Sequence, residues 1–152
     1  MNVMIQRLLS VVAILAVCGI VVSSVSLQHH YAKSKTEFCD IGENFNCDLV
    51  NRSQYSEVLG FPVALIGMLG YAAMAGLATV YRDRRETPSL ILGGAAAGLA
   101  FALYLTYIEA RVLGVWCLLC LGSLALISAI TIVGALLWVK SRNGLQSAAG
   151  NQ

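Results

Sequence analysis

Residues 112–139 read VLGVWCLLCLGSLALISAITIVGALLWV, a run without any charged side chain that carries two cysteines near its start. A helix that crosses the hydrocarbon core of a bilayer needs about 20 apolar residues. This run exceeds that length, and three further uncharged runs reach it, at residues 8–27, 58–81 and 87–108. The sequence therefore predicts an all-α, polytopic membrane protein: a four-transmembrane-helix bundle with an outer loop, residues 28–57, between its first two helices.

The overall composition excludes two other classes of protein. Of the 152 residues, 58% are hydrophobic and only 12% are charged. A soluble globular domain carries about 25% charged residues, and a disordered chain is more polar still. The net charge of +2 gives no electrostatic footprint for binding nucleic acid. We expect a single membrane domain over residues 1–152, surrounded by membrane lipid and without a nucleic-acid partner.

The charged residues between the runs divide unevenly between the two sides of the membrane. One side has more basic than acidic residues, and the other has the reverse. The basic residues of the first side are Arg7, Arg82, Arg84, Arg85, Lys140 and Arg142, beside the acids Asp83 and Glu86. The second side has Lys33, Lys35, Arg52 and Arg111 beside Glu37, Asp40, Glu43, Asp48, Glu57 and Glu109. By the positive-inside rule the first side is cytoplasmic. We expect both termini in the cytoplasm, the active site on the extracytoplasmic side, and a place in the inner (cytoplasmic) membrane.

The first run also has features of a cleavable signal peptide. Arg7 would form its basic n-region, and Ser24-Val25-Ser26 would supply small residues for cleavage. The apolar stretch is longer than the usual h-region of a signal peptide. This length favours an uncleaved first helix.

Four of the five cysteines map to the outer side. Cys39 and Cys47 lie in the predicted outer loop, and Cys117 and Cys120 lie near the start of the fourth run. Counting about 20 residues back from Lys140, taken as the inner interface, places Cys120 at the outer edge of the hydrocarbon. The i,i+3 spacing puts the sulfurs of Cys117 and Cys120 on one face of a helix.

A CxxC motif at a helix N-terminus is typical of redox chemistry. Unpaired amides and the helix dipole stabilise a thiolate there, and Arg111 is close enough in sequence to add positive charge. Disulfides also persist on the outer side of a bacterial membrane. Two pairs on that side suggest a relay from Cys39 and Cys47 to Cys117 and Cys120 by thiol–disulfide exchange, ending at an acceptor dissolved in the membrane.

Other readings of the cysteines remain open. A small cysteine-based heavy-metal transporter would need thiols deeper in the membrane, where only Cys18, which we interpret as a packing residue, is found. A scaffold with one loop disulfide would leave the CxxC motif unexplained. His29 and His30 could join Cys39 and Cys47 in a zinc site, but their spacing differs from the usual ligand patterns. Solvated interfacial histidines, and no metal, are therefore the preferred interpretation.

The order of these motifs resembles the vitamin K epoxide reductase family, in its bacterial and archaeal branch. The resemblance extends over residues 8–139 and combines the loop cysteine pair with Ser53-x-Tyr55, Gly60-x-Pro62 and Trp116-Cys117-x-x-Cys120. It implies a four-helix bundle around a quinone (ubiquinone, menaquinone or a vitamin K-type quinone) that accepts electrons. DsbB is also four-helical and quinone-linked, but its CxxC motif lies in the first outer loop.

The resemblance also implies roles for individual residues. Cys39 would exchange with a thioredoxin-fold (DsbA-like) partner protein, Cys47 would pass electrons to Cys117, and Cys120 would meet the quinone. Ser53 matches the family's serine that hydrogen-bonds near the quinone or supports the loop. A helix N-cap is the alternative role for Ser53, and the two roles are compatible.

Two departures from the animal enzymes favour simple quinone reduction over epoxide reduction. Leu124 stands where those enzymes have a tyrosine four residues after the last cysteine, and their asparagine has no counterpart between Gly60 and Tyr81. Only a short polar tail follows Lys140, so the redox partner is expected to be a separate protein. The sequence thus predicts a membrane thiol:quinone oxidoreductase that supports disulfide bond formation.

Overall fold

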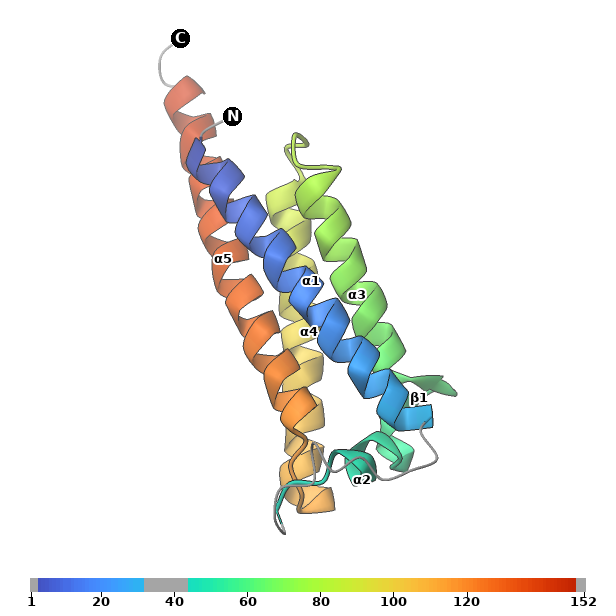
Figure 1. Cartoon of the computed structure of the whole chain (residues 1–152). Helices are drawn as coiled ribbons and strands as arrows, with labels where there is room; N and C mark the ends of the chain where they lie inside the picture. The colour runs from blue at the N-terminus through green and yellow to red at the C-terminus, as the bar shows by residue number, and fades with distance from the viewer. Residues whose placement is uncertain (1–2, 32–43, 150–152) are drawn as a thin grey trace.

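The fold is an up-and-down bundle of helices. A computed structural model describes residues 3–31 and 44–149 of the chain. Within these ranges, each of the four long helices packs on two others, in the cyclic order α1, α3, α4, α5 (Figure 1). Their bounds are Val3–Tyr31 for α1, Val63–Thr79 for α3, Thr87–Ile108 for α4 and Leu118–Ala149 for α5.

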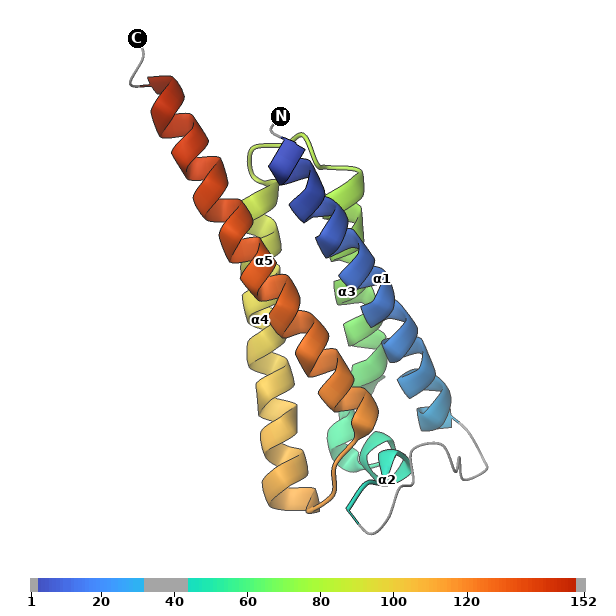
Figure 2. The same cartoon turned by 60° about the vertical axis from the view of Figure 1, so that its left-hand side comes forward.

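The two ends of the bundle are built differently. The N- and C-terminal ends of the chain lie at the same end as the turn between α3 and α4 (Figure 1). The opposite end carries α2 and β1, together with the connection between α4 and α5 (Figures 1 and 2). Its short elements are α2 (Cys47–Asn51), the 3-10 helix η2 (Gln54–Ser56), β1 (Glu57–Val58), β2 (Phe61–Pro62) and the π-helical turn η3 (Glu109–Leu113).

Two predicted runs begin later as helices than their hydrophobicity indicated. The run at 58–81 becomes helical only at Val63, because β1 and β2 form an antiparallel hairpin. Leu59 and Gly60 have φ values of 54° and 82°, the positive values that a two-residue hairpin turn requires. The run at 112–139 is interrupted after η3 by Gly114, which is left-handed at φ 66°.

The chain is a helical membrane protein. Three helical segments in the described ranges are long and apolar enough to cross a bilayer: Val3–Tyr31, Thr87–Leu113 and Leu118–Gly144. The apolar α3 has 17 residues, which gives it a length of about 26 Å against roughly 30 Å of hydrocarbon. The prediction of four spans is therefore confirmed for three helices, and the crossing by α3 stays a prediction.

A closely packed apolar core fills the end of the bundle near the termini. Its most buried members come from all four long helices: Leu9, Val12, Ala16, Tyr71, Met74, Ala78, Ile91, Ala95, Ile127, Ile130 and Leu137. Gly19 is required where α1 meets α3, since a Cβ at this position would lie 2.5 Å from the ring of Tyr71. Small residues thus bring helices together where lipid gives no hydrophobic drive for their association.

The last turns of α5 extend beyond the other helices (Figure 2). The prediction ended this span at Val139, yet the helix continues to Ala149. On this part of α5, the guanidinium carbon of Arg142 lies 4.7 Å from the centre of the Trp138 ring. This distance is within the range of a cation–π contact.

Candidate functional site

The backbone preceding Cys47 lies beside the backbone preceding Cys117. Phe45 and Trp116 form an isolated parallel β-bridge. The Asn46 amide donates to the Trp116 carbonyl over 3.1 Å, and the Trp116 amide donates to the Asn44 carbonyl over 2.9 Å. Two segments about 70 residues apart in the sequence are thereby held in a fixed register just before their cysteines.

This pairing brings Cys47 and Cys117 into one buried cluster. Cys47 is 1% exposed, Cys117 is 0% exposed, and both pack with Val50, with Cys120 at the edge of the cluster. Cys47 is disulfide-bonded, whereas Cys117 and Cys120 are free thiols. Cys39 lies outside the described residues. Of the four predicted redox cysteines, the structure thus brings three together.

Asn51, which the sequence analysis did not select, joins the two cysteine segments. Its side-chain amide donates to the Cys47 carbonyl over 3.0 Å and contacts the Cys117 sulfur at 3.8 Å. The Ser26 hydroxyl of α1 donates to the Asn51 side-chain oxygen over 2.6 Å. The signal available in the sequence was the i,i+4 spacing from Cys47, which places both residues on one helix face.

The CxxC motif opens α5, as predicted. Cys117 directly precedes the helix, and its carbonyl accepts from the Leu121 amide over 3.0 Å. A hydrogen bond from the Cys120 thiol lowers the pKa of Cys117, and the backbone amides of Cys120 and Leu119 act in the same direction. The first turn of the helix therefore stabilises a thiolate on Cys117.

The charged residue that is hydrogen-bonded to the CxxC motif is an acid. Glu109 is 2% exposed, and its Oε2 accepts from the Cys117 amide over 3.1 Å. Arg111 is exposed, and the contribution of its charge to the CxxC motif stays a prediction. An acid at the end of a long apolar run, eight residues before Cys117, was the missed signal.

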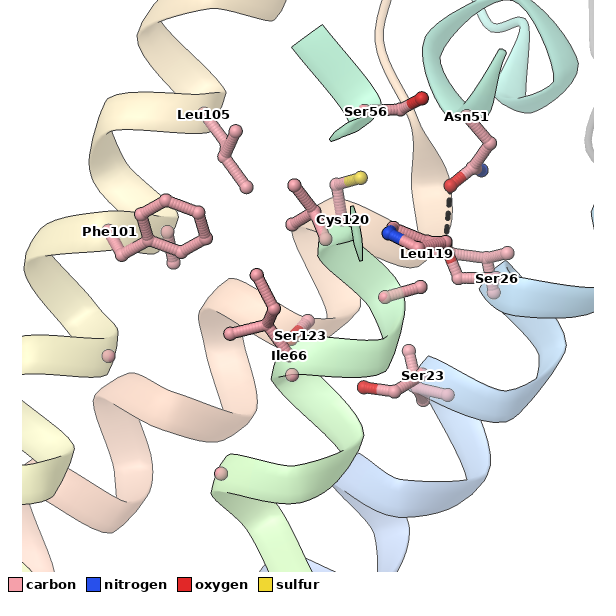
Figure 3. Close-up of a pocket in the computed structure, with 18 of the residues that line it drawn as sticks. Ser23, Ser26, Asn51, Ser56, Ile66, Phe101, Leu105, Leu119, Cys120 and Ser123 are labelled. Carbon is pink, nitrogen blue, oxygen red and sulfur yellow. Dashed lines mark hydrogen bonds between the residues drawn. The ribbon is translucent and has the colours of Figure 1, made fainter. Parts of the chain in front are cut away.

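A cavity of about 390 Å³ adjoins Cys120. It is lined by residues of all four long helices and of the segment from α2 to β2, and apolar side chains dominate the lining. Figure 3 shows the Cys120 sulfur at this cavity, between Leu105 and Asn51. The labelled polar residues are Ser23, Ser26, Asn51, Ser56 and Ser123. An apolar cavity of this size with a few polar groups is typical of a small-molecule site.

Ser53, predicted to lie near the quinone or to support the loop, lines this cavity. Its hydroxyl donates to the Val50 carbonyl over 2.8 Å. It occupies the N-cap position of η2, but its side chain makes no capping hydrogen bond there. Ser53 thus both lines the cavity and forms a hydrogen bond with the backbone of the loop.

The two histidines at the end of α1 are not solvated, contrary to the preferred interpretation. His29 is 6% exposed and its Nδ1 lies 3.1 Å from a carboxylate oxygen of Asp48. His30 lies against the cavity, with Nδ1 at 2.6 Å from the Asn51 carbonyl and Nε2 at 3.3 Å from the Glu57 carboxylate. These contacts connect the end of α1 to α2 and β1.

Cys18 stands apart from this site. It is a free and exposed thiol on α1, on a helix that crosses the apolar region. It does not belong to the lining of the cavity.

A comparison with protein-family models finds the family that the order of the sequence motifs resembles. The family model described as the vitamin K epoxide reductase family matches residues 10–135. The matched region contains the described site residues from Ser23 to Ile127 as well as Cys39.

Proposed function

Since the chain belongs to the vitamin K epoxide reductase family, whose members are membrane thiol–disulfide oxidoreductases, we propose that it transfers electrons from a protein thiol to a quinone. The donor is an extracytoplasmic thioredoxin-fold (DsbA-like) protein. The acceptor is a membrane quinone: ubiquinone, menaquinone or a vitamin K-type quinone. The net result is a new disulfide in the donor, so the reaction supports disulfide bond formation.

The proposal rests on the environment that Cys47 shares with the CxxC motif. Cys47 and Cys117 are buried in one cluster, and one Asn51 amide contacts both segments. Cys120 belongs to the same cluster and also lines the cavity. A path from Cys47 to a membrane-soluble acceptor is therefore available without any large movement of α5.

The exchange between the pairs balances as two successive substitutions at sulfur. The Cys47 thiolate attacks Cys117 of a Cys117–Cys120 disulfide, forming the Cys47–Cys117 bond and releasing the Cys120 thiolate. The Cys39 thiolate then attacks Cys47, which restores the loop disulfide and releases Cys117. Once the Cys120 thiolate has taken up a proton, its thiol hydrogen bond lowers the pKa of Cys117 and makes Cys117 a good leaving group in this second step.

The cavity supports a quinone as the final acceptor. Its volume of about 390 Å³ lies within the range of small-molecule sites, and its polar groups gather near Cys120. As the Cys117–Cys120 disulfide forms again, two electrons and two protons pass to the quinone and yield the quinol. We propose that Ser53 and Cys120 are the residues at the quinone.

The orientation in the membrane follows from the ends of the bundle. The end with the termini carries Arg7, Arg82, Arg84, Arg85, Lys140 and Arg142. With this end in the cytoplasm, the site faces the outside of the inner membrane. Reporter fusions after Arg85 and after Glu57 test the assignment, and a cytoplasmic signal from the Glu57 fusion would contradict it.

The function is tested with four single variants and two electron donors. Cys39→Ala and Cys47→Ala should lose quinone reduction driven by a protein thiol, yet retain much of it with a small dithiol, which can reduce the Cys117–Cys120 disulfide directly. Cys117→Ala and Cys120→Ala should fail with both donors. The readout is quinone absorbance against time, with Cys18→Ala as the matched control. An equal loss in all four variants with the small dithiol would refute the relay.

A further inference from the structure

Glu109 has a buried carboxyl oxygen that the fold does not satisfy. Its Oε2 is bound by the Cys117 amide, but its Oε1 has no hydrogen-bond partner among the described residues. A buried polar atom without a partner is unfavourable, and an ionised carboxylate is more so. Packing alone therefore gives no reason for an acid at this position.

The surroundings of Glu109 are those of a group that exchanges protons. The residue lines the cavity together with Cys120, and its carboxylate accepts from the Cys117 amide. Quinone reduction needs two protons as well as two electrons, and they must reach oxygens that sit in a mainly apolar cavity. His30 also lines the cavity, but both of its ring nitrogens are held by Asn51 and Glu57. Glu109 is left as the cavity-lining acid that is hydrogen-bonded to the CxxC motif, through the Cys117 amide.

We propose that Glu109 is a catalytic proton carrier between the Cys120 thiol and the quinone, an inference that rests on the proposed function. The Cys117–Cys120 bond forms as the Cys117 thiolate and the Cys120 thiol give up two electrons and the proton of Cys120. Glu109 gives one proton to a quinone oxygen and recovers one from Cys120, so the carboxyl ends in its starting state. The other quinone oxygen takes its proton from water, and the two electrons and both protons are then found in the quinol.

The first test compares Glu109→Gln with Glu86→Gln. Glutamine keeps an oxygen for the Cys117 amide but cannot carry a proton, whereas Glu86 is exposed at the opposite end of the bundle. Quinol formation by Glu109→Gln should fall about 100-fold or more, the range for loss of general acid–base catalysis. Reduction of the Cys117–Cys120 disulfide by a small dithiol without quinone, followed by thiol labelling, should stay normal. Glu86→Gln should match the wild type in both steps.

A second variant separates proton transfer from structural support. Glu109→Ala leaves a space beside Cys120 that formate can enter, so added formate should restore quinol formation in a concentration-dependent way. Wild-type quinol rates in Glu109→Gln would overturn the inference. So would loss of both steps without rescue by formate, because that result indicates a structural role. A wild-type protein that reduces no quinone would instead overturn the proposed function, and this inference with it.

Discussion

The two ends of the bundle differ in their interior: one is filled by apolar side chains, and the other contains a cavity and buried polar residues. The end near the termini is filled by apolar side chains such as Val12, Ile91 and Leu137. Of the buried polar residues in the described part of the chain, all except Thr87 lie toward the other end: Ser23, Ser26, His29, Asn51 and Glu109. All of these except His29 line the cavity, and since polar groups are unfavourable in a membrane, their position indicates that this end carries the functional site. The apolar core at the end near the termini packs together the helices that also line the cavity.

Filling the cavity should have the largest effect. Gly70 lines the cavity and a Cβ there would meet no atom within 4 Å, so Gly70→Leu should fold while its side chain occupies the quinone site. We expect quinone reduction to fall by about 100-fold or more, mainly through loss of quinone binding. Steady-state rates against quinone concentration measure this effect.

The matched control for this variant is on the same helix. Gly76 also has free space for a Cβ, but it is outside the cavity lining. Gly76→Leu should keep wild-type rates. If Gly70→Leu and Gly76→Leu lose activity equally, the distinction between an end with a cavity and an end with a filled core is wrong.

Removing the amide of Asn51 should slow the transfer between the cysteine pairs. Asn51→Leu removes the side-chain oxygen that accepts from the Ser26 hydroxyl, and so leaves that hydroxyl unsatisfied. A loss of about 1–3 kcal/mol per unsatisfied group corresponds to roughly a 5- to 150-fold slower exchange. The rate with a protein thiol should fall more than the rate with a small dithiol. Asn143→Leu, at an exposed position on α5, is the control, and equal ratios for the two donors in both variants would contradict the role of Asn51.

Overpacking the junction of α1 and α3 should lower stability by a smaller amount. Gly19→Ala places a Cβ against the Tyr71 ring, and overpacking of this kind costs about 1–3 kcal/mol. Gly93→Ala on α4 meets no atom within 4 Å, so it should gain up to about 1 kcal/mol from helix propensity. Thermal unfolding in one detergent compares the two. If Gly19→Ala and Gly93→Ala unfold at the same midpoint temperature, α1 and α3 can move apart at Gly19 without loss of stability, and the expectation of overpacking is wrong.

The smallest expected effect is on the ionisation of Cys117. Cys120→Ala removes the hydrogen bond that lowers the pKa of Cys117, so that pKa should rise and thiolate should be lost at a higher pH as the solution is acidified. Cys120→Ser keeps a donor at the same place and should retain the lower pKa. Ultraviolet absorbance of the thiolate against pH, with the other three cysteines replaced by alanine, measures the difference. Identical titrations would contradict the role of the Cys120 thiol.

The long helices were predictable because an uncharged run of sufficient length leaves the backbone few alternatives in a bilayer. The helix boundaries were less predictable, since they depend on backbone conformation rather than on hydrophobicity. Leu59 and Gly60 turn the chain into a hairpin inside an apolar run, and Gly114 ends η3 before α5 begins. These positions lie inside uncharged runs of the sequence, so charge and hydrophobicity do not mark them.

The candidate site was predictable where its motif is local. The CxxC spacing located Cys117 and Cys120 at the start of a helix, as the structure has them. Asn51 and Glu109 were missed because their roles arise from contacts across the fold, to α1 and to the start of α5. In the sequence, Glu109 is only one of several charged residues on the predicted outer side of the membrane.

The contact between Trp138 and Arg142 fixes a reference point on α5 from which the depth of Cys120 in the bilayer can be estimated. Aromatic and basic side chains anchor at the level of the lipid headgroups, and 18 helical residues, about 27 Å, separate Trp138 from Cys120. That length is close to the thickness of the hydrocarbon, roughly 30 Å. A thinner or thicker bilayer would therefore shift Cys120 relative to the far headgroups, unless the helix tilts to compensate. Lipid acyl-chain length becomes a variable that sets how easily a water-soluble donor and a lipid-soluble acceptor reach the same pair of sulfurs.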